Sequence, residues 1–288
     1  MKRLLVGHSI VDEIDGAPPS PGGLFYAAAA LASTKRPEED IALLTGADAE
    51  TRRLFAPVYQ AFRADLIVRL HRAPRVRLTL RRDGEREERY EFRPAPLPLD
   101  EIDERFDALY LNLTTGEDVE PDALARYRRR SGCGVYLDAH TLARGWGKRG
   151  ERTYRDVEDF PRWARSIDVL QVNEREALAV AAAETESDAL ARLFAWGVSR
   201  VVVTRAERGA ELFRPDAPPL RETPPAPTDE QCVGCGDVFG AVFFYWYFVG
   251  FDEREALRRA VSAANRAARA RRREDLHDLR DDETGRPD

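Results

Sequence analysis

The sequence predicts an α/β fold in which helices cover a mainly parallel β-sheet. The main observation is the regular alternation of strand-like and helix-like segments after Pro98, which is typical of parallel strands joined by helical crossovers. The length of 288 residues, 43% of them apolar, suits one large domain over 1–288 with a substantial core. Short buried strands are expected at 108–112, 134–138, 169–172, 201–204 and 210–213.

The remaining segments extend this pattern, with one interruption at residues 66–93. Three short segments there alternate arginine or glutamate with apolar residues around the hairpin signal Asp83-Gly84, as in a sheet with one wet face. We expect residues 66–93 to be an inserted β-sheet that can cover a site. Other expected elements are strands at 4–7 and 41–46, helices at 26–33, before Arg63, at 237–249 and at 253–273, and a proline-rich loop at 215–227.

Composition excludes several classes of function. The formal net charge is −6, and arginines are interleaved with acids, as at 81–88, which argues against nucleic-acid binding and indicates solvated faces. The longest apolar run, residues 238–251, is shorter than the roughly 20 residues that span a bilayer. Three cysteines make no disulfide framework, and Met1-Lys2-Arg3 opens no signal peptide. We expect a cytoplasmic protein.

The most informative motif is Gly234-Cys235-Gly236-Asp237, followed by an apolar helical run. Glycines allow a tight turn that aims successive N–H groups at one point, and a helix start adds a positive dipole end. Such a site binds phosphate, and an aspartate beside it can act as a base. The alternative is a plain tight turn with Asp237 as a helix-start residue. We interpret the motif as a phosphoryl-transfer site with Asp237 as its base.

This motif resembles that of the ribokinase-like (PfkB) family of carbohydrate and nucleoside kinases, roughly Asp-Thr-x-Gly-Ala-Gly-Asp-x-Phe. The matching positions are Gly234, Gly236, Asp237 and Phe239. Cys235 replaces the alanine, and Gln231-Cys232 replaces the leading Asp-Thr. The resemblance implies a three-layer sandwich with a small β-sheet lid at 66–93, an anion hole over 234–237, Asp237 as catalytic base, and ATP with Mg²⁺ as cofactors.

Two further segments carry the resemblance on the nucleotide side. Asn173 and Glu176 match the family's Asn-x-x-Glu, which implies a role in binding phosphate and Mg²⁺, with Glu176 acting through water; the alternative is an ordinary helix start. Thr204 to Gly209 resembles the family's Thr-x-Gly-x-x-Gly nucleotide segment, with Ala206 in place of the first glycine. Asn265 lies where the family often places a helix near the adenine, although an exposed helical asparagine is an equally good interpretation.

At the acceptor end, Gly22-Gly23 before a helix matches the family's amino-terminal Gly-Gly signature, while Ala27 stands where an asparagine is usual. Asp12, expected at the end of the first strand, matches an acidic residue that holds sugar hydroxyls, or is a solvated turn acid. The resemblance implies a small hydroxyl-bearing substrate: a sugar, a polyol such as an inositol, or a nucleoside. A monomer or a homodimer is expected.

Two other classes of function stay open. The replacements at Cys232, Ala27 and Ala206 permit a non-catalytic ribokinase-like protein that binds or regulates a partner. Cys232 and Cys235 form a CxxC pair that permits a redox or zinc site, for which Cys133 is the one further cysteine. His8 and His140 are expected at strand ends that face the site, where either can contact substrate.

Overall fold

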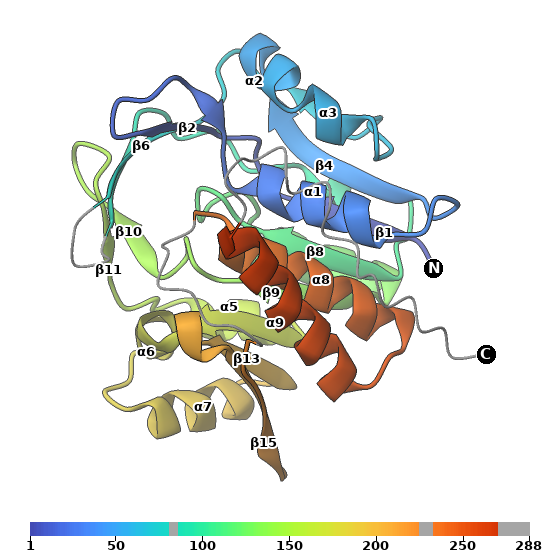
Figure 1. Cartoon of the computed structure of the whole chain (residues 1–288), viewed down its shortest axis with the longest axis vertical. Helices are drawn as coiled ribbons and strands as arrows, with labels where there is room; N and C mark the ends of the chain where they lie inside the picture. The colour runs from blue at the N-terminus through green and yellow to red at the C-terminus, as the bar shows by residue number, and fades with distance from the viewer. Residues whose placement is uncertain (81–85, 225–232, 270–288) are drawn as a thin grey trace.

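The structure is a computed structural model that describes residues 1–80, 86–224 and 233–269. A nine-stranded sheet forms its centre, with the strand order β15-β14-β13-β12-β9-β8-β1-β4-β5 (Figure 1). Neighbouring strands pair in parallel, except that β14 is antiparallel to both β13 and β15. The strands are β1 (Arg3–Val6), β4 (Ile41–Ala47), β5 (Ile67–Arg69), β8 (Ala108–Asn112), β9 (Gly134–Asp138), β12 (Val169–Asn173), β13 (Arg200–Thr204), β14 (Ala210–Arg214) and β15 (Ala217–Glu222).

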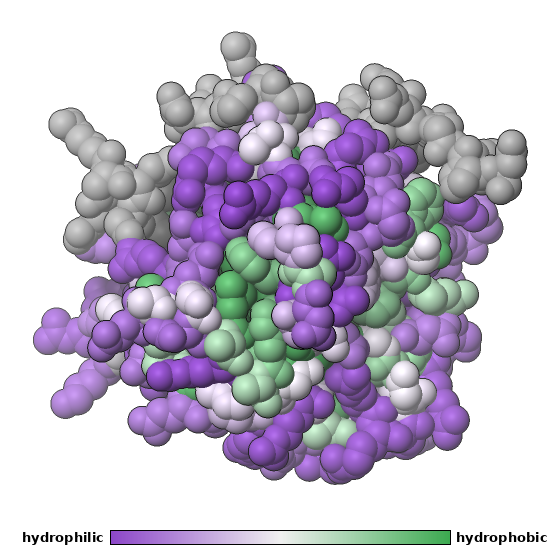
Figure 2. Space-filling view, turned by 90° about the horizontal axis from the view of Figure 1, so that it is seen from below, coloured by the Kyte–Doolittle hydropathy of each residue, from purple (hydrophilic) through white to green (hydrophobic). Residues whose placement is uncertain are grey.

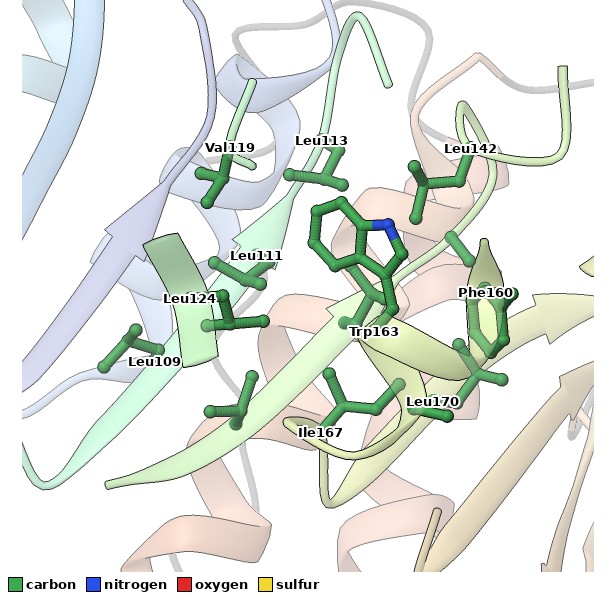
Figure 3. Close-up of a cluster of buried hydrophobic side chains, with 14 of the residues drawn as sticks. Leu109, Leu111, Leu113, Val119, Leu124, Leu142, Phe160, Trp163, Ile167 and Leu170 are labelled. Atoms are coloured by element: carbon green, nitrogen blue, oxygen red, sulfur yellow. The ribbon is translucent and has the colours of Figure 1, made fainter. Parts of the chain in front are cut away.

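Helices cover both faces of this sheet, because each buried strand alternates apolar side chains between two cores. In β8, Leu109 and Leu111 belong to one core, and Ala108 and Tyr110 to the other. Figure 3 shows leucines of the first core around Trp163. Helices of this core are α4 (Pro121–Ser131), α5 (Phe160–Ala164), α6 (Glu174–Ala181) and α7 (Glu186–Ala195); those of the second are α1 (Leu24–Thr34), α3 (Ala56–Tyr59), α8 (Cys235–Val249) and α9 (Glu253–Arg269). The predicted three-layer sandwich is confirmed.

The small β-sheet exists, but its membership differs from the prediction. Its order is β3 (Ser20–Pro21), β2 (Val11–Ile14), β6 (Arg75–Leu80) and β7 (Arg86–Tyr90). Residues 67–69 pair instead with β4 in the central sheet, and residues 11–21 join the small sheet. The prediction missed this because β2 pairs with β6 across about sixty residues of sequence, and local patterns carry no signal for such pairings. Asp83-Gly84 lies outside the described residues.

Two further predictions need correction, and one element was not predicted. Residues 217–222, expected in a proline-rich loop, form edge strand β15, where prolines are tolerated because one side needs no N–H donors. The helix expected before Arg63 is two short ones, α2 (Ala49–Leu54) and α3, since Pro57 in the first turn of α3 starts a new helix. A hairpin of β10 (Arg144–Trp146) and β11 (Arg152–Tyr154) was not predicted. A short 3₁₀ helix, η1 (Leu99–Glu101), precedes β8, and η2 (Ala206–Arg208) precedes β14.

The face shown in Figure 2 is mainly hydrophilic, with hydrophobic residues gathered near its centre and smaller groups toward one side. Within the part of the chain that the structure describes, every helix is too short or too polar to cross a membrane.

Candidate active site

Polar side chains end several neighbouring strands at one edge of the central sheet. Asn112 of β8 pairs in register with Asp138 of β9, and Asn173 of β12 pairs with Thr204 of β13. Because these strands are parallel, their carboxyl ends share one edge, where ligands bind in open α/β sheets. The edge therefore collects Asn173 and Thr204, which the sequence predicted, beside Asn112 and Asp138, which it did not.

Helix α8 starts at the glycine motif and points its amino end at this edge. Gly234 has a φ of 93° and precedes the first helical residue, Cys235. A Cβ on Gly234 would lie 2.3 Å from the ring of Tyr26 in α1, so both the backbone angle and the packing require glycine. Gly234 to Asp237 thus form the turn and first helical residues, whose N–H groups helix geometry directs outward along the axis.

Asp237 is held in place by the end of β8. The side-chain amide of Asn112 donates a hydrogen bond of 2.7 Å to the Asp237 carboxylate, and Tyr110 donates one of 3.4 Å to the Asp237 backbone carbonyl. Gln171 of β12 similarly donates to the carbonyl of Gly236 at 3.0 Å. Asn112 is fully buried. No motif singled it out, since one asparagine at a strand end carries little signal alone.

A histidine with its own carboxylate faces Asp237. His140 Nδ1 lies 3.4 Å from the Asp138 carboxylate, and ligand atoms of Asp138, His140 and Asp237 all lie within 4.8 Å of one another. Burial opposes protonation of the His140 ring, but the Asp138 carboxylate outweighs it and raises the pKa of His140 to about 9. At neutral pH an imidazolium therefore stands beside Asp237, which fits the expectation that His140 faces the site.

The other predicted histidine lies deeper. His8 is fully buried, its ring hydrogen-bonds the backbone carbonyl of Ala95 at 3.0 Å, and burial lowers its pKa. The expectation that His8 can touch substrate therefore finds no support in its position. Its backbone N–H donates a hydrogen bond to the Asp118 carboxylate, so the residue connects the loops behind the site.

Helix α6 starts with a capping box. The Asn173 side chain accepts from the N–H of Glu176 at 2.9 Å, and the Glu176 carboxylate accepts from the N–H of Asn173 at 2.8 Å. Burial raises the pKa of Glu176, while the nearby charges of His140 and Arg144 oppose that rise. The helix-start interpretation is thus realised, and it leaves Glu176 beside the same cluster. Carboxylate oxygens of Asp138 and Glu176 are the type of donor that suits Mg²⁺.

The predicted nucleotide segment follows β13. Thr204 Oγ donates to the carbonyl of Val172 at 3.4 Å. Ala206 has a φ of 49°, a left-handed angle that an alanine adopts at some cost and a glycine would adopt freely. Gly209 has a φ of 88°, and a Cβ there would lie 2.0 Å from the Glu222 carbonyl. Asn265 lies half-buried in α9.

On the acceptor side, Asp12 and the glycine pair meet. Asp12 lies in β2 of the small sheet rather than at the end of the first strand, and it is 3% exposed. A Cβ on Gly22 would lie 1.9 Å from the Asp12 carboxylate. Gly23 precedes α1 with a φ of 35°, and Ala27 is buried in α1. Asp12 therefore belongs to the small sheet, which the predicted boundaries 66–93 did not extend to.

The two described cysteines do not gather. Cys133 is buried at the amino end of β9, the opposite edge of the sheet from Asp138, and burial raises the pKa of its thiol. Cys235 is half-buried at the start of α8, and Cys232 lies outside the described residues. Cys133 therefore does not join Cys235, and the CxxC pair of Cys232 and Cys235 stays a prediction.

Known proteins are similar to this chain in sequence over part of its length and in fold over nearly all of it. Residues 151–273 match the family model described as pfkB family carbohydrate kinase. A structure of a pyrophosphate-dependent kinase in the ribokinase family, complexed with sulfate, superposes with a TM-score of 0.78 at 19% identity, covering 96% of this chain and 99% of that one. The match to the pfkB family model covers residues 151–273, and the whole chain has the ribokinase fold. The resemblance seen in the motifs is confirmed.

Other ribokinase-like proteins are similar in fold or in part of the sequence. Ribokinase from Arabidopsis thaliana, complexed with ribose and ATP, has a TM-score of 0.72 at 18% identity and covers 96% of this chain and 97% of its own. Cytidine kinase from Thermococcus kodakarensis is 32% identical over 102 residues, and a second Arabidopsis thaliana ribokinase match is 33% identical over 106. The chain spans about a third of the length of these curated relatives (36% and 28%), and the matches take up 34% and 35% of this chain.

Proposed function

We propose that this protein is an ATP-dependent phosphotransferase that moves the terminal phosphoryl group to a hydroxyl of a small sugar, polyol or nucleoside. The observation that carries the proposal is the placement of Asp237. Its carboxylate stands at the amino end of α8, is oriented by Asn112 at 2.7 Å, and lies at the ligand-binding edge of the sheet.

The mechanism assigns a role to each part of this arrangement. The transferred phosphoryl group rests at the start of α8, where Gly234, Cys235 and Gly236 bring the backbone close and the helix dipole favours an anion. Asp237 accepts the proton of the acceptor hydroxyl as that oxygen attacks phosphorus in line. The His140 imidazolium, paired with Asp138, adds positive charge where the transition state spreads negative charge. Glu176, acting through water, and Asp138 would hold Mg²⁺, which neutralises charge on the donor phosphates.

On the acceptor side, we assign Asp12 and the Gly22-Gly23 turn to binding the substrate hydroxyls. The small sheet acts as a lid that excludes water from the site. We assign Thr204, Gly209 and Asn265 to binding the nucleotide. Structural neighbours include a kinase complexed with myo-inositol and a pyrophosphate analogue, and sequence relatives include a cytidine kinase and a ribokinase. Sugars, inositols and nucleosides are therefore the acceptors to test. The state as monomer or homodimer and the cytoplasmic location stay predictions.

The proposal is tested by an acceptor screen coupled to ADP release with Mg²⁺, run beside the Asp237→Asn variant. We expect turnover on at least one acceptor, and a loss of about 10²- to 10⁴-fold in kcat for the variant with ATP binding kept, because the amide cannot accept the proton. Turnover that survives in Asp237→Asn would show that Asp237 is not the base.

A non-catalytic binding or regulatory role is the second candidate, and the buried Ala27 in α1 favours it, since an alanine offers an acceptor no polar contact. This alternative predicts that acceptors shift the melting temperature while no acceptor releases ADP. The same screen therefore separates the two functions.

A further inference from the structure

Two arginines lie against one tyrosine ring, near the cluster formed by Asp138, His140 and Asp237. Arg144 of β10 stands opposite Tyr154 of β11 in the hairpin, with its guanidinium carbon 4.6 Å from the ring centre. The guanidinium carbon of Arg175, in the first turn of α6, lies 4.4 Å from the same centre. Arg144 also donates to the Tyr154 hydroxyl at 3.0 Å. Two cations are thus held at one ring by elements far apart in the sequence.

This arginine–tyrosine cluster, Arg144, Tyr154 and Arg175, lies between the small sheet and α6, where Figure 1 shows β10 and β11. Arg144 forms an ion pair of 3.1 Å with Glu88 of β7, and both side chains are almost fully buried. Arg175 directly precedes Glu176, whose carboxyl group feels the charges of both Arg144 and His140. The cluster therefore adjoins the groups assigned to Mg²⁺ and the phosphates.

One atom of the cluster is left without a partner. Arg144 is only 8% exposed, and its Nε is buried without a hydrogen-bond partner within the described ranges. Buried donors are nearly always satisfied, so an unsatisfied one needs an explanation. Glu88 pairs with Arg144, and a phosphate beside the two guanidinium groups would further reduce their mutual repulsion. Arginine is the side chain best suited to phosphate, through paired N–H donors.

We propose that Arg144 and Arg175 form a subsite for the donor phosphate next to the one that is transferred. This rests on the proposed function. Two guanidinium groups already contact the ring of Tyr154, and the subsite recognises charge. The ligand chemistry is a phosphoanhydride, and inorganic diphosphate satisfies the subsite as fully as a nucleotide does.

With diphosphate as donor the reaction balances simply. The acceptor oxygen forms a bond to the transferred phosphorus while the bridging P–O bond breaks. The electron pair of that bond stays on the departing orthophosphate, which Arg144 and Arg175 hold, and the hydroxyl proton passes to Asp237.

The test compares Arg175→Ala with Arg208→Ala. Both arginines are exposed and adjoin the start of α6, but Arg208 lies on the Thr204 side, where it pairs with Glu174 at 2.7 Å. Removing Arg175 takes a cation from a helix amino end, which does not destabilise the helix. Binding of methylenediphosphonate with Mg²⁺ is measured by calorimetry, and turnover is measured separately with diphosphate and with ATP.

We expect Arg175→Ala to weaken methylenediphosphonate binding about tenfold, the loss of one charged hydrogen bond, and Arg208→Ala to match the parent. We also expect diphosphate to support turnover with release of orthophosphate. Unchanged binding in Arg175→Ala, or a loss confined to Arg208→Ala, overturns the subsite and places the donor along Thr204–Gly209. Turnover with ATP alone overturns the diphosphate part. Arginine-dependent binding without turnover on any donor would instead refute the proposed function and leave the subsite standing.

Discussion

Two helices, α6 and α8, begin at the same edge of the sheet, and they begin differently. At the start of α6, Asn173 and Glu176 exchange hydrogen bonds, so two helix-end donors are satisfied by the chain itself. At the start of α8 stands Gly234, which has no side chain and so cannot cap, with the Tyr26 ring packed against its Cα. One helix start is closed by its own side chains, and the other is shaped for close approach of a ligand.

This difference separates two kinds of motif match. Asn173 and Glu176 stabilise the fold whether or not a ligand binds, and their match to a functional signature is compatible with structure alone. Gly234 provides no side-chain cap, and its left-handed turn and the Asp237 carboxylate held by Asn112 fix the geometry of the start of α8. We therefore base the proposed function on α8 and treat α6 as its support.

The largest expected effect comes from paired glycine variants at the start of α8. Gly234→Ala should lower the free energy of unfolding by about 2 to 4 kcal/mol, because a left-handed alanine is strained and its Cβ meets Tyr26. Gly236→Ala is the matched control, since its Cβ would lie 3.7 Å from the nearest side-chain atom, that of Gln171. It should keep the stability and lose activity, as its methyl group obstructs the phosphoryl group. Urea unfolding and initial rates measure both; full activity in Gly236→Ala would contradict the anion hole.

Asn112→Leu should separate positioning from stability. Asn112 Oδ1 is buried without a partner in the described part of the chain, but the amide group donates to Asp237, so its loss should lower the unfolding free energy by about 1 to 3 kcal/mol. Without the 2.7 Å contact to Asp237, kcat should fall about ten- to a hundredfold. The acid limb of the rate profile should also move to higher pH, because the lost donor favoured the charged carboxylate. A large loss of stability with an unmoved profile would make Asn112 merely structural.

The ion pair of His140 with Asp138 predicts a pH dependence of stability. The pKa of His140 is raised to about 9 from the ordinary 6.5, so its contribution is complete below pH 6.5 and is lost as the pH rises toward 9. Urea unfolding at pH 6.5 and 9.5 should show this loss, and His140→Gln should remove it. His8 does not interfere, because its lowered pKa confines its effect to pH values below 6.5. Equal pH dependence in the parent and the variant would disprove the pairing.

The smallest effects concern α6. Asn173→Ala should cost about 1 kcal/mol through the lost cap. Glu176→Gln keeps the capping box, because glutamine accepts the same hydrogen bond, and so isolates the carboxylate charge. We expect it to retain stability and to require more Mg²⁺ for half-maximal rate. An unchanged Mg²⁺ requirement would reduce α6 to a structural element.

Much of the fold could be predicted because local patterns control it. The apolar strands 108–112 and 134–138 and the helix after Gly236 follow from residues adjacent in sequence. The pairing of residues 11–14 with β6, the placement of 67–69 in the central sheet, and the hairpin of Arg144 and Tyr154 depend on contacts between distant segments. Asn112 and Asp138 were not predicted for the same reason, because the roles of these side chains depend on the residues that lie opposite them in the folded chain.

By itself, the sequence determined the alternation of strands and helices, the glycine turn before α8 and the acid at its start, because propensity and backbone freedom are properties of neighbouring residues. Only the tertiary structure decided that Asn112 holds Asp237, that His140 is charged beside it, that Asp12 rests on Gly22, and that two arginines share the Tyr154 ring. Hydrogen bonding, charge pairing and desolvation act through space, and their partners here lie up to 125 residues apart.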